Sequence, residues 1–160
     1  MNFSKRLVYL FFAVCLIGII GCEGKDEKDA TVPDPPGTII ANISKNSSDP
    51  YVRDYVRINT GDNLITVTWL RPDNIYAGAF HDSEICTVGS VSGLGNITTI
   101  PTLGYTTDVA CEPGYGYVIR ARADENSEYK YMRLYVVSSI ENTYGGIMGA
   151  TVKYQYPFEP

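Results

Sequence analysis

The sequence predicts an all-β protein with a single compact β-sandwich, from the periodicity of its apolar residues and the turns between them. Three segments alternate apolar and polar side chains with a period of two, the pattern of strands with one buried face. They are residues 65–69, 115–123 and 150–156. Turn-forming residues stand at 60–63, 124–128 and 145–146. No segment shows the 3.6-residue periodicity of an amphipathic helix.

We expect about eight or nine strands, bounded by these turns and by other Gly, Pro and Asn positions. In chain order they are residues 38–43, a strand ending near 58, one starting near 64, then 75–80, 84–88, 97–100, 115–123, 129–140 and 150–156. This spacing is typical of a two-sheet sandwich. A small β-barrel is the alternative, because a single sequence does not show which strands pair.

The segment 129–140 differs from the other predicted strands because both of its faces carry large side chains. Met132, Leu134 and Val136 share one face. Tyr131, Arg133, Tyr135 and Val137 share the other. We therefore expect both faces of this strand to be partly covered.

The amino terminus has the pattern of a bacterial lipoprotein signal. Lys5 and Arg6 precede an apolar run, residues 7–20, which ends in the lipobox Ile19-Ile20-Gly21-Cys22. A permanent membrane-spanning helix needs roughly 20 apolar residues, more than this run supplies. A basic end, an apolar stretch and a small residue at the cleavage point are instead the parts of a cleaved signal. We expect residues 1–21 to be removed as a signal peptide and Cys22 to carry lipid, with palmitate as the label that would detect it.

Residues 22–36 are predicted to be a flexible, acidic and proline-rich tether, because they offer almost no apolar side chain to bury. The two or three acyl chains of a mature lipoprotein would anchor the protein permanently. The stretch Lys25-Asp26-Glu27 resembles an export signal that places some lipoproteins in the outer leaflet of the outer membrane; a merely solvated linker is the alternative. We expect an outer-membrane location at the cell surface, with the periplasmic face as the alternative.

Residues 37–160 are predicted to be one β domain, since about 120 residues suffice for one compact core and not for two. Once residues 1–21 are removed, 11 basic residues face 18 acidic ones, a net charge of −7. Nucleic acid is excluded as a partner because no basic patch is present to displace counterions from phosphates. The expected partners are the membrane, through the lipid anchor, and either a glycan or an envelope protein.

Cys86 and Cys111 are the cysteines left once Cys15 is cleaved and Cys22 carries lipid. Two interpretations stay open for them. A disulfide would close a loop and stabilise the fold by about 3 kcal/mol in the chain-entropy model. Alternatively, both are buried free thiols that pack as small apolar groups.

The sequence predicts neither catalytic residues nor a cofactor, and we expect that the protein is not an enzyme. His81 is the sole histidine, and its acidic and thiol neighbours alternate in direction along a strand instead of converging on it. No metal site is expected. The one calcium candidate is the hairpin tip with Asp124, Asn126 and Glu128, whose oxygens suit that ion although their spacing departs from an EF-hand.

The aromatic content supplies the other functional signal, since the chain contains 13 tyrosines and one tryptophan. Planar rings can lie against the apolar faces of sugars while polar neighbours bind the hydroxyl groups. Trp69, Tyr131 and Tyr135 are therefore the candidate ligand-contacting aromatics. The alternative is that tyrosine serves here as a good strand residue with a buried ring and a solvated hydroxyl.

Four glycine- and tyrosine-rich segments carry a resemblance to a known family. They are residues 91–101, 113–118, 133–136 and 145–158. Together they resemble an uncharacterised family of Bacteroidales-type outer-membrane lipoproteins with a domain of unknown function. The resemblance implies a compact β domain behind a lipidated cysteine, and it transfers no catalytic or ligand-binding residue.

The expected function is that of a lipid-anchored cell-envelope lipoprotein with a non-catalytic binding or accessory β domain. A glycan-binding module that assists polysaccharide capture is the alternative. A polysaccharide hydrolase comes third, because two carboxylates suffice for glycoside hydrolysis but no pair stands out among the 18 acidic residues.

Overall fold

The computed structural model describes residues 30–45, 55–70, 73–77 and 82–160, which form antiparallel strands and one short 3-10 turn. The strands are β1 (Ile39–Lys45), β2 (Tyr55–Asn59), β3 (Thr66–Leu70), β4 (Asn74–Ala77), β5 (Asp82–Ser90), β6 (Asp108–Ala110), β7 (Tyr115–Arg122), β8 (Lys130–Glu141) and β9 (Ile147–Gln155). The 3-10 turn η1 (Leu94–Asn96) follows β5.

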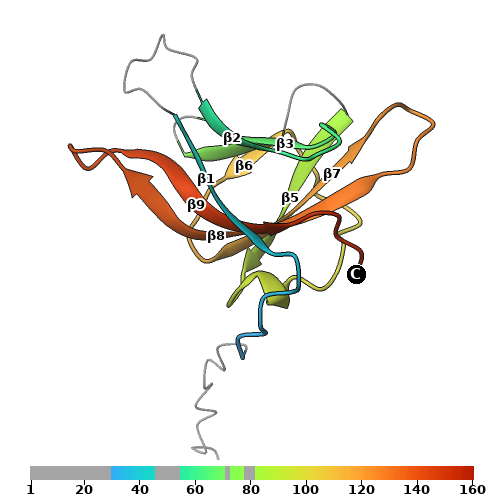
Figure 1. Cartoon of the computed structure of the whole chain (residues 1–160), viewed down its shortest axis with the longest axis horizontal. Helices are drawn as coiled ribbons and strands as arrows, with labels where there is room; N and C mark the ends of the chain where they lie inside the picture. The colour runs from blue at the N-terminus through green and yellow to red at the C-terminus, as the bar shows by residue number, and fades with distance from the viewer. Residues whose placement is uncertain (1–29, 46–54, 71–72, 78–81) are drawn as a thin grey trace, which may run out of the picture.

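Two antiparallel sheets face each other (Figure 1). One has the order β5-β7-β8-β9-β1, and the other has the order β2-β3-β4-β6. The sheets meet at one edge where β1 pairs with β2 through Ser44 and Lys45. At the opposite edge, a single bridge joins Ile85 to Thr106. The predicted β-sandwich is confirmed, and over the described ranges this lone bridge does not extend into a ladder that would close a barrel.

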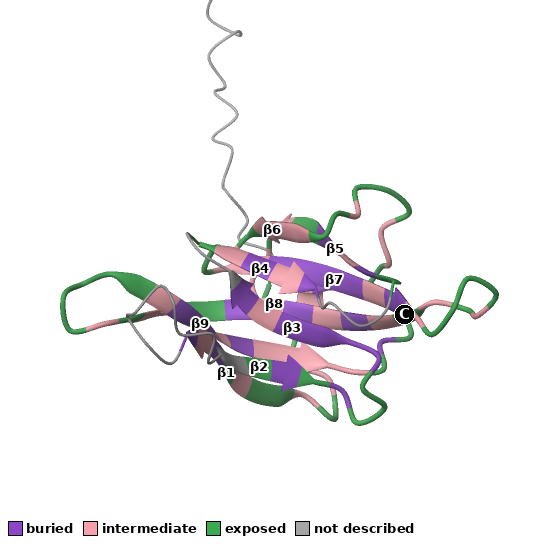
Figure 2. Cartoon of the chain, turned by 90° about the horizontal axis from the view of Figure 1, so that it is seen from above, coloured by how far each residue is buried: buried purple, intermediate pink, exposed green. Residues whose placement is uncertain are grey.

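The main hydrophobic core fills the space between the sheets. Trp69 is its largest buried side chain, and Tyr117 is fully buried beside aliphatic neighbours from both sheets. Burial of a large apolar side chain contributes about 1.5–3 kcal/mol, so this core dominates the stability of the fold. In Figure 2 the buried residues follow the middles of the strands, and exposed residues are concentrated in the connecting loops.

A second, smaller cluster covers the outer face of β7 and β8. It consists of Leu94, Ile97, Val118 and Phe158. Val118 points into this cluster while its neighbours Tyr117 and Ile119 point into the main core, so β7 is buried on both faces. The prediction of cover on both faces of the segment 129–140 is confirmed over its first half, where Tyr131 and Tyr135 pack against the second cluster.

Most predicted strands and turns are confirmed, with two corrections. The predicted strand at 97–100 is wrong, because Ile97 enters the second cluster from a loop that follows η1. Strand β6 was missed, since it has three residues and its pattern is too short to recognise. Strand β4 covers the first part of the predicted segment 75–80, and residues 78–80 lie outside the described residues.

The predicted turn at 60–63 joins β2 to β3 and contains Asn63 at φ 57°, the left-handed conformation that Asn tolerates. The turns at 124–128 and 145–146 connect β7 to β8 and β8 to β9, as predicted.

The last part of the predicted tether, residues 30–36, lies against the β domain. The side-chain amide of Asn96 accepts from the Val32 N–H at 3.2 Å and donates to the Ala30 carbonyl at 3.2 Å. Asp34 forms an ion pair with Lys153 at 2.6 Å. The sequence predicts a flexible tether at residues 22–36, but from Ala30 onward the structure gives this segment specific partners. The partners Asn96 and Lys153 are distant in sequence, so the composition of the segment did not indicate them.

Candidate functional site

A hollow of about 790 Å³ opens where three segments meet at one end of the sandwich. These segments are the β2–β3 turn, the β7–β8 hairpin and the chain that follows β9. The hollow is lined by Asp62, Leu64, Ala123, Ser127, Glu128, Tyr129, Lys130, Tyr131, Tyr156, Pro157, Phe158 and Glu159. Three tyrosines and a phenylalanine alternate here with charged groups, the mixture typical of small-molecule sites.

Asp62 ties the three segments together. Its Oδ1 accepts from the Thr60 hydroxyl at 2.6 Å and from the Leu64 N–H at 3.1 Å, which closes the β2–β3 turn. Its Oδ2 accepts from the Tyr156 hydroxyl at 2.5 Å and from Lys130 Nζ at 3.2 Å. One carboxylate thus holds the turn, strand β8 and the carboxyl-terminal segment in register around the hollow.

These contacts also set the charge of Asp62. Burial opposes ionisation, but hydrogen bonds from Thr60, Tyr156, Leu64 and Lys130 outweigh it and hold the pKa of Asp62 well below its usual range. The pKa of the Tyr156 hydroxyl is raised, first by burial and then by its bond to this carboxylate. Asp62 is therefore ionised and Tyr156 protonated at neutral pH, which keeps their hydrogen bond intact.

Two arginines on β7 lie over the ring of Tyr129, one of the aromatic residues that line the hollow. The Arg120 guanidinium lies 4.5 Å from the centre of the Tyr129 ring, and that of Arg122 lies 4.9 Å from it. Arg120 also stacks on Tyr105, at 4.0 Å. Such cation–π contacts are worth about 0.5–1 kcal/mol each at exposed positions, and they hold the Tyr129 ring in place.

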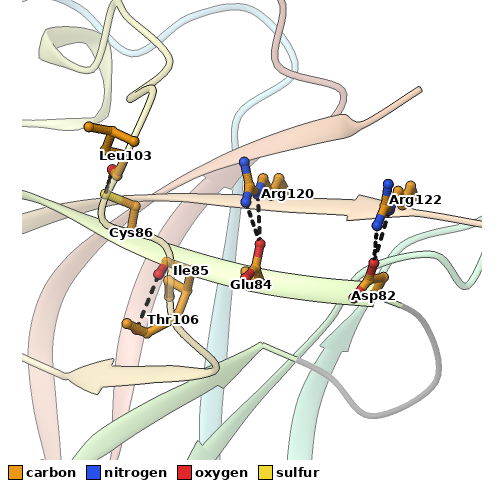
Figure 3. A network of polar contacts seen from close by, with 8 residues as sticks. All are labelled: Asp82, Glu84, Ile85, Cys86, Leu103, Thr106, Arg120 and Arg122. Atoms are coloured by element: carbon orange, nitrogen blue, oxygen red, sulfur yellow. Dashed lines mark hydrogen bonds and ion pairs between the residues drawn. The ribbon is translucent and has the colours of Figure 1, made fainter. Parts of the chain in front are cut away.

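The same arginines are fixed by carboxylates of the neighbouring strand β5 (Figure 3). Arg120 donates from Nη2 and Nε to Glu84 at 2.6 and 2.8 Å. Arg122 forms the equivalent pair with Asp82, at 2.6 and 2.9 Å. Both pairs follow from the strand register, in which Asp82 faces Arg122 and Glu84 faces Arg120.

Tyr131 is the predicted ligand aromatic that the structure places in the hollow. Its ring centre lies 6.4 Å from that of Tyr129, with 43° between the ring planes. Its backbone carbonyl accepts from the Phe158 N–H at 2.8 Å, which attaches the carboxyl-terminal segment to β8.

The other two predicted aromatics do not line the hollow. Trp69 is 1% exposed and lies in the main core, so its assignment as a ligand contact is wrong; its position on the buried face of β3 explains the error. Tyr135 packs against the second cluster instead. Tyr156 and Asp62 were missed because they reach the hollow only through tertiary contacts, and Asp62 carried no signal beyond that of a turn residue.

The calcium candidate is a hairpin turn. Asp124 Oδ1 accepts from the Asn126 N–H at 2.9 Å. The pKa of Asp124 is lowered, first by a hydrogen bond from the Ser127 side chain and then by this backbone contact. Glu128 lines the hollow instead of facing Asp124 across a shared ion site. Among the residues with described positions, no three His, Cys, Asp or Glu side chains are grouped as metal ligands.

Cys86 and Cys111 are both free thiols in the structure, so the disulfide left open by the sequence is not formed there. The Cys86 thiol contacts the Leu103 carbonyl at 3.4 Å. Burial raises the pKa of Cys111 to about 12, with Asp73 and Glu112 adding to the effect, so this thiol is un-ionised at neutral pH. The predicted lipidation site Cys22, and His81, lie outside the described residues.

No family model matches the chain, and neither the curated proteins nor the solved structures that were searched contain a match. Within the part of the chain that the structure describes, no helix is long and apolar enough to span a membrane.

Proposed function

We propose that the protein is a lipid-anchored lipoprotein of the cell envelope whose β domain is a non-catalytic binding module. The lipobox ending in Cys22 supports the anchor. The acidic stretch Lys25-Asp26-Glu27 supports an outer-membrane location at the cell surface. The segments 91–101, 113–118, 133–136 and 145–158 resemble an uncharacterised family of outer-membrane lipoproteins, which is consistent with the proposed anchor.

The hollow is the proposed binding site, and its cross-linked construction is the observation that carries the proposal. Asp62 joins three segments that are distant in sequence, and two arginines make cation–π contacts with the Tyr129 ring. Such a wall is organised before any ligand arrives, so binding costs little side-chain ordering. Pre-formed pockets with aromatic walls and a few polar groups are typical of ligand recognition.

A hydrolase is the less favoured alternative because of the state of Asp62. A glycosidase needs one carboxyl group that is protonated at working pH and can donate its proton. Asp62 accepts four hydrogen bonds, and its lowered pKa keeps it deprotonated, so it cannot serve as that acid. Glu128 and Glu159 also line the hollow. A direct assay for sugar release from soluble polysaccharides tests whether either of them acts as the acid of a hydrolase.

In-cell photo-crosslinking tests the proposal without assuming a ligand. The photoreactive p-benzoylphenylalanine would replace Ala123, an exposed residue that lines the hollow, in the full chain, and Thr143 in the exposed β8–β9 hairpin would be replaced as the control. We expect covalent adducts from position 123 and few from position 143. Equal yields at the two positions, or none at 123, would reject the hollow as the binding site.

The anchor has its own test. Palmitate labelling should mark the full-length protein, and Cys22→Ala should abolish the label. A labelled Cys22→Ala protein, or retained residues 1–21 in the mature chain, would overturn the envelope assignment.

A further inference from the structure

We infer that the hollow takes an uncharged, hydroxyl-rich ligand, a neutral sugar unit of a polysaccharide. This inference rests on the proposed binding role of the same hollow and names its ligand class. Three features support it: the aromatic wall, the polar groups left over after the internal contacts are made, and the sign of the local charge.

The aromatic wall offers rings that are partly exposed and already held in place. Tyr129 is supported by the guanidinium groups of Arg120 and Arg122, and Tyr156 is held through its hydroxyl by Asp62. Tyr131 is the third half-buried ring. A sugar presents C–H groups on one face, and apolar contact with a flat ring releases water from both surfaces.

The polar groups of the hollow form two sets: those that bind one another and those without a partner in the protein. In the first set, the Asp62 carboxylate accepts hydrogen bonds from the Tyr156 hydroxyl and from Lys130. Glu128 and Glu159 make no hydrogen bond or ion pair with any other residue that the structure describes. The hydroxyls of Tyr129 and Tyr131 are likewise without a partner among those residues.

These remaining groups match the hydrogen-bonding needs of a sugar. Two carboxylates can accept from ligand hydroxyls, and two phenolic hydroxyls can donate to or accept from them. An aliphatic chain would leave these groups unused, at the cost of their hydration.

Charge excludes the acidic polysaccharides. The charged side chains lining the hollow are Asp62, Glu128, Glu159 and Lys130, three negative groups against one positive. A uronic acid or a sulfated sugar would place its anion beside two unpaired carboxylates. A neutral ligand avoids this repulsion and binds with little dependence on salt.

Affinity electrophoresis of the full-length, detergent-solubilised protein tests the inference. The gels would contain a neutral polysaccharide (dextran, mannan or xyloglucan), acidic polygalacturonate, or cationic chitosan. We expect at least one neutral polymer to retard the protein, and raising the salt to roughly 0.5 M to leave the retardation unchanged. Retardation by polygalacturonate or chitosan alone, or by no polymer, would overturn the inference.

Matched variants locate the site. Tyr131→Ala and Glu128→Gln should each weaken binding about tenfold, as expected for a central contact residue. Tyr144→Ala and Glu141→Gln make the same changes at the exposed tip of the β8–β9 hairpin and should bind as wild type. Glu128 is exposed, so its variant remains informative if Tyr131→Ala does not fold. Equal losses in the hollow and control variants would overturn the assignment.

The two proposals fail in different ways. If position 123 crosslinks to a protein in cells and no neutral polysaccharide binds, the binding module stands and the sugar inference falls. If position 123 gives no adduct of any kind, the binding site itself is wrong.

Discussion

The first half of β8, residues 130–136, and its second half, residues 137–141, differ in what covers them. In the first half, Met132, Leu134 and Val136 are fully buried in the main core, and the opposite face carries the second cluster. In the second half, Val137 is 41% exposed, and the strand continues into a hairpin whose Tyr144 is 93% exposed. Both halves keep their ladder with β9, interrupted by irregularities near Val136 and Glu141.

The comparison separates strand pairing from packing. Backbone hydrogen bonds extend along the whole of β8, but the buried alternation of side chains stops at Val136. Figure 1 shows the β8–β9 hairpin projecting past β2 and β3 of the facing sheet, and its Tyr144 is exposed among the residues that the structure describes. The candidate site lies at the packed end, where rings and charges are fixed by neighbours.

The largest expected effect comes from the two adjacent valines. Val136→Ala removes buried methyl groups from the core and should lower the free energy of unfolding by about 2–3 kcal/mol. Val137→Ala makes the same change one residue later and should cost less than about 0.5 kcal/mol. Denaturant unfolding measures both. Similar losses at the two positions would show that pairing, and not packing, determines the stability of this strand.

Asp62→Asn is the second prediction, with an expected loss of about 1–2 kcal/mol because the anion that Lys130 and Tyr156 contact is removed. The pKa of Asp62 is lower in the folded protein than in the unfolded chain, so its contribution is fully present at neutral pH.

As the pH falls below about 4, the unfolded chain binds a proton that the folded protein still excludes, and this contribution is progressively lost. Unfolding curves between roughly pH 6 and pH 3 should therefore show a smaller loss of stability on acidification for Asp62→Asn than for wild type. Parallel curves would contradict the assigned role.

The smallest expected loss of stability concerns residues 31–33, which pack against Gly95 without pairing as a strand. A Cβ added at Gly95 would lie 2.3 Å from the Pro33 carbonyl oxygen and 2.7 Å from that of Val32. Gly95→Ala should therefore displace residues 31–33 while costing about 1 kcal/mol, because a surface segment can move away. Faster proteolysis there than in a Gly61→Ala control, which has open space around the added Cβ, is the expected readout. Unchanged cleavage would contradict the docking.

Sequence periodicity located the long strands: the segments 115–123 and 150–156 correspond to β7 and β9, and the polar turns fall where expected. The prediction of a single buried face is wrong for β7, because Val118 is buried in the second cluster while Tyr117 and Ile119 are buried in the main core.

Periodicity failed for the segment 97–100, which was predicted as a strand. Its apolar residues Ile97 and Ile100 lie in a loop and pack in the second cluster. The sequence pattern also placed an acidic, proline-rich stretch in solvent although Asn96 and Lys153 bind it.

The candidate site was only partly predictable. Tyr131 was named because planar rings can lie against the faces of sugars, and the structure places it in the hollow. Trp69 was chosen by the same chemistry but faces the core. Asp62 and Tyr156 lie 94 positions apart, and no local pattern signals that their side chains meet. A constellation built from a turn, a hairpin and a chain end becomes visible only in three dimensions.

Hydrogen exchange measured by mass spectrometry, on the full-length protein with and without a neutral polysaccharide that retards it in gels, tests the central claim most directly. The account predicts slower exchange in peptides covering 60–64, 127–131 and 156–159, and unchanged exchange across 141–147. Protection confined to the β8–β9 hairpin, with none around the hollow, would contradict it.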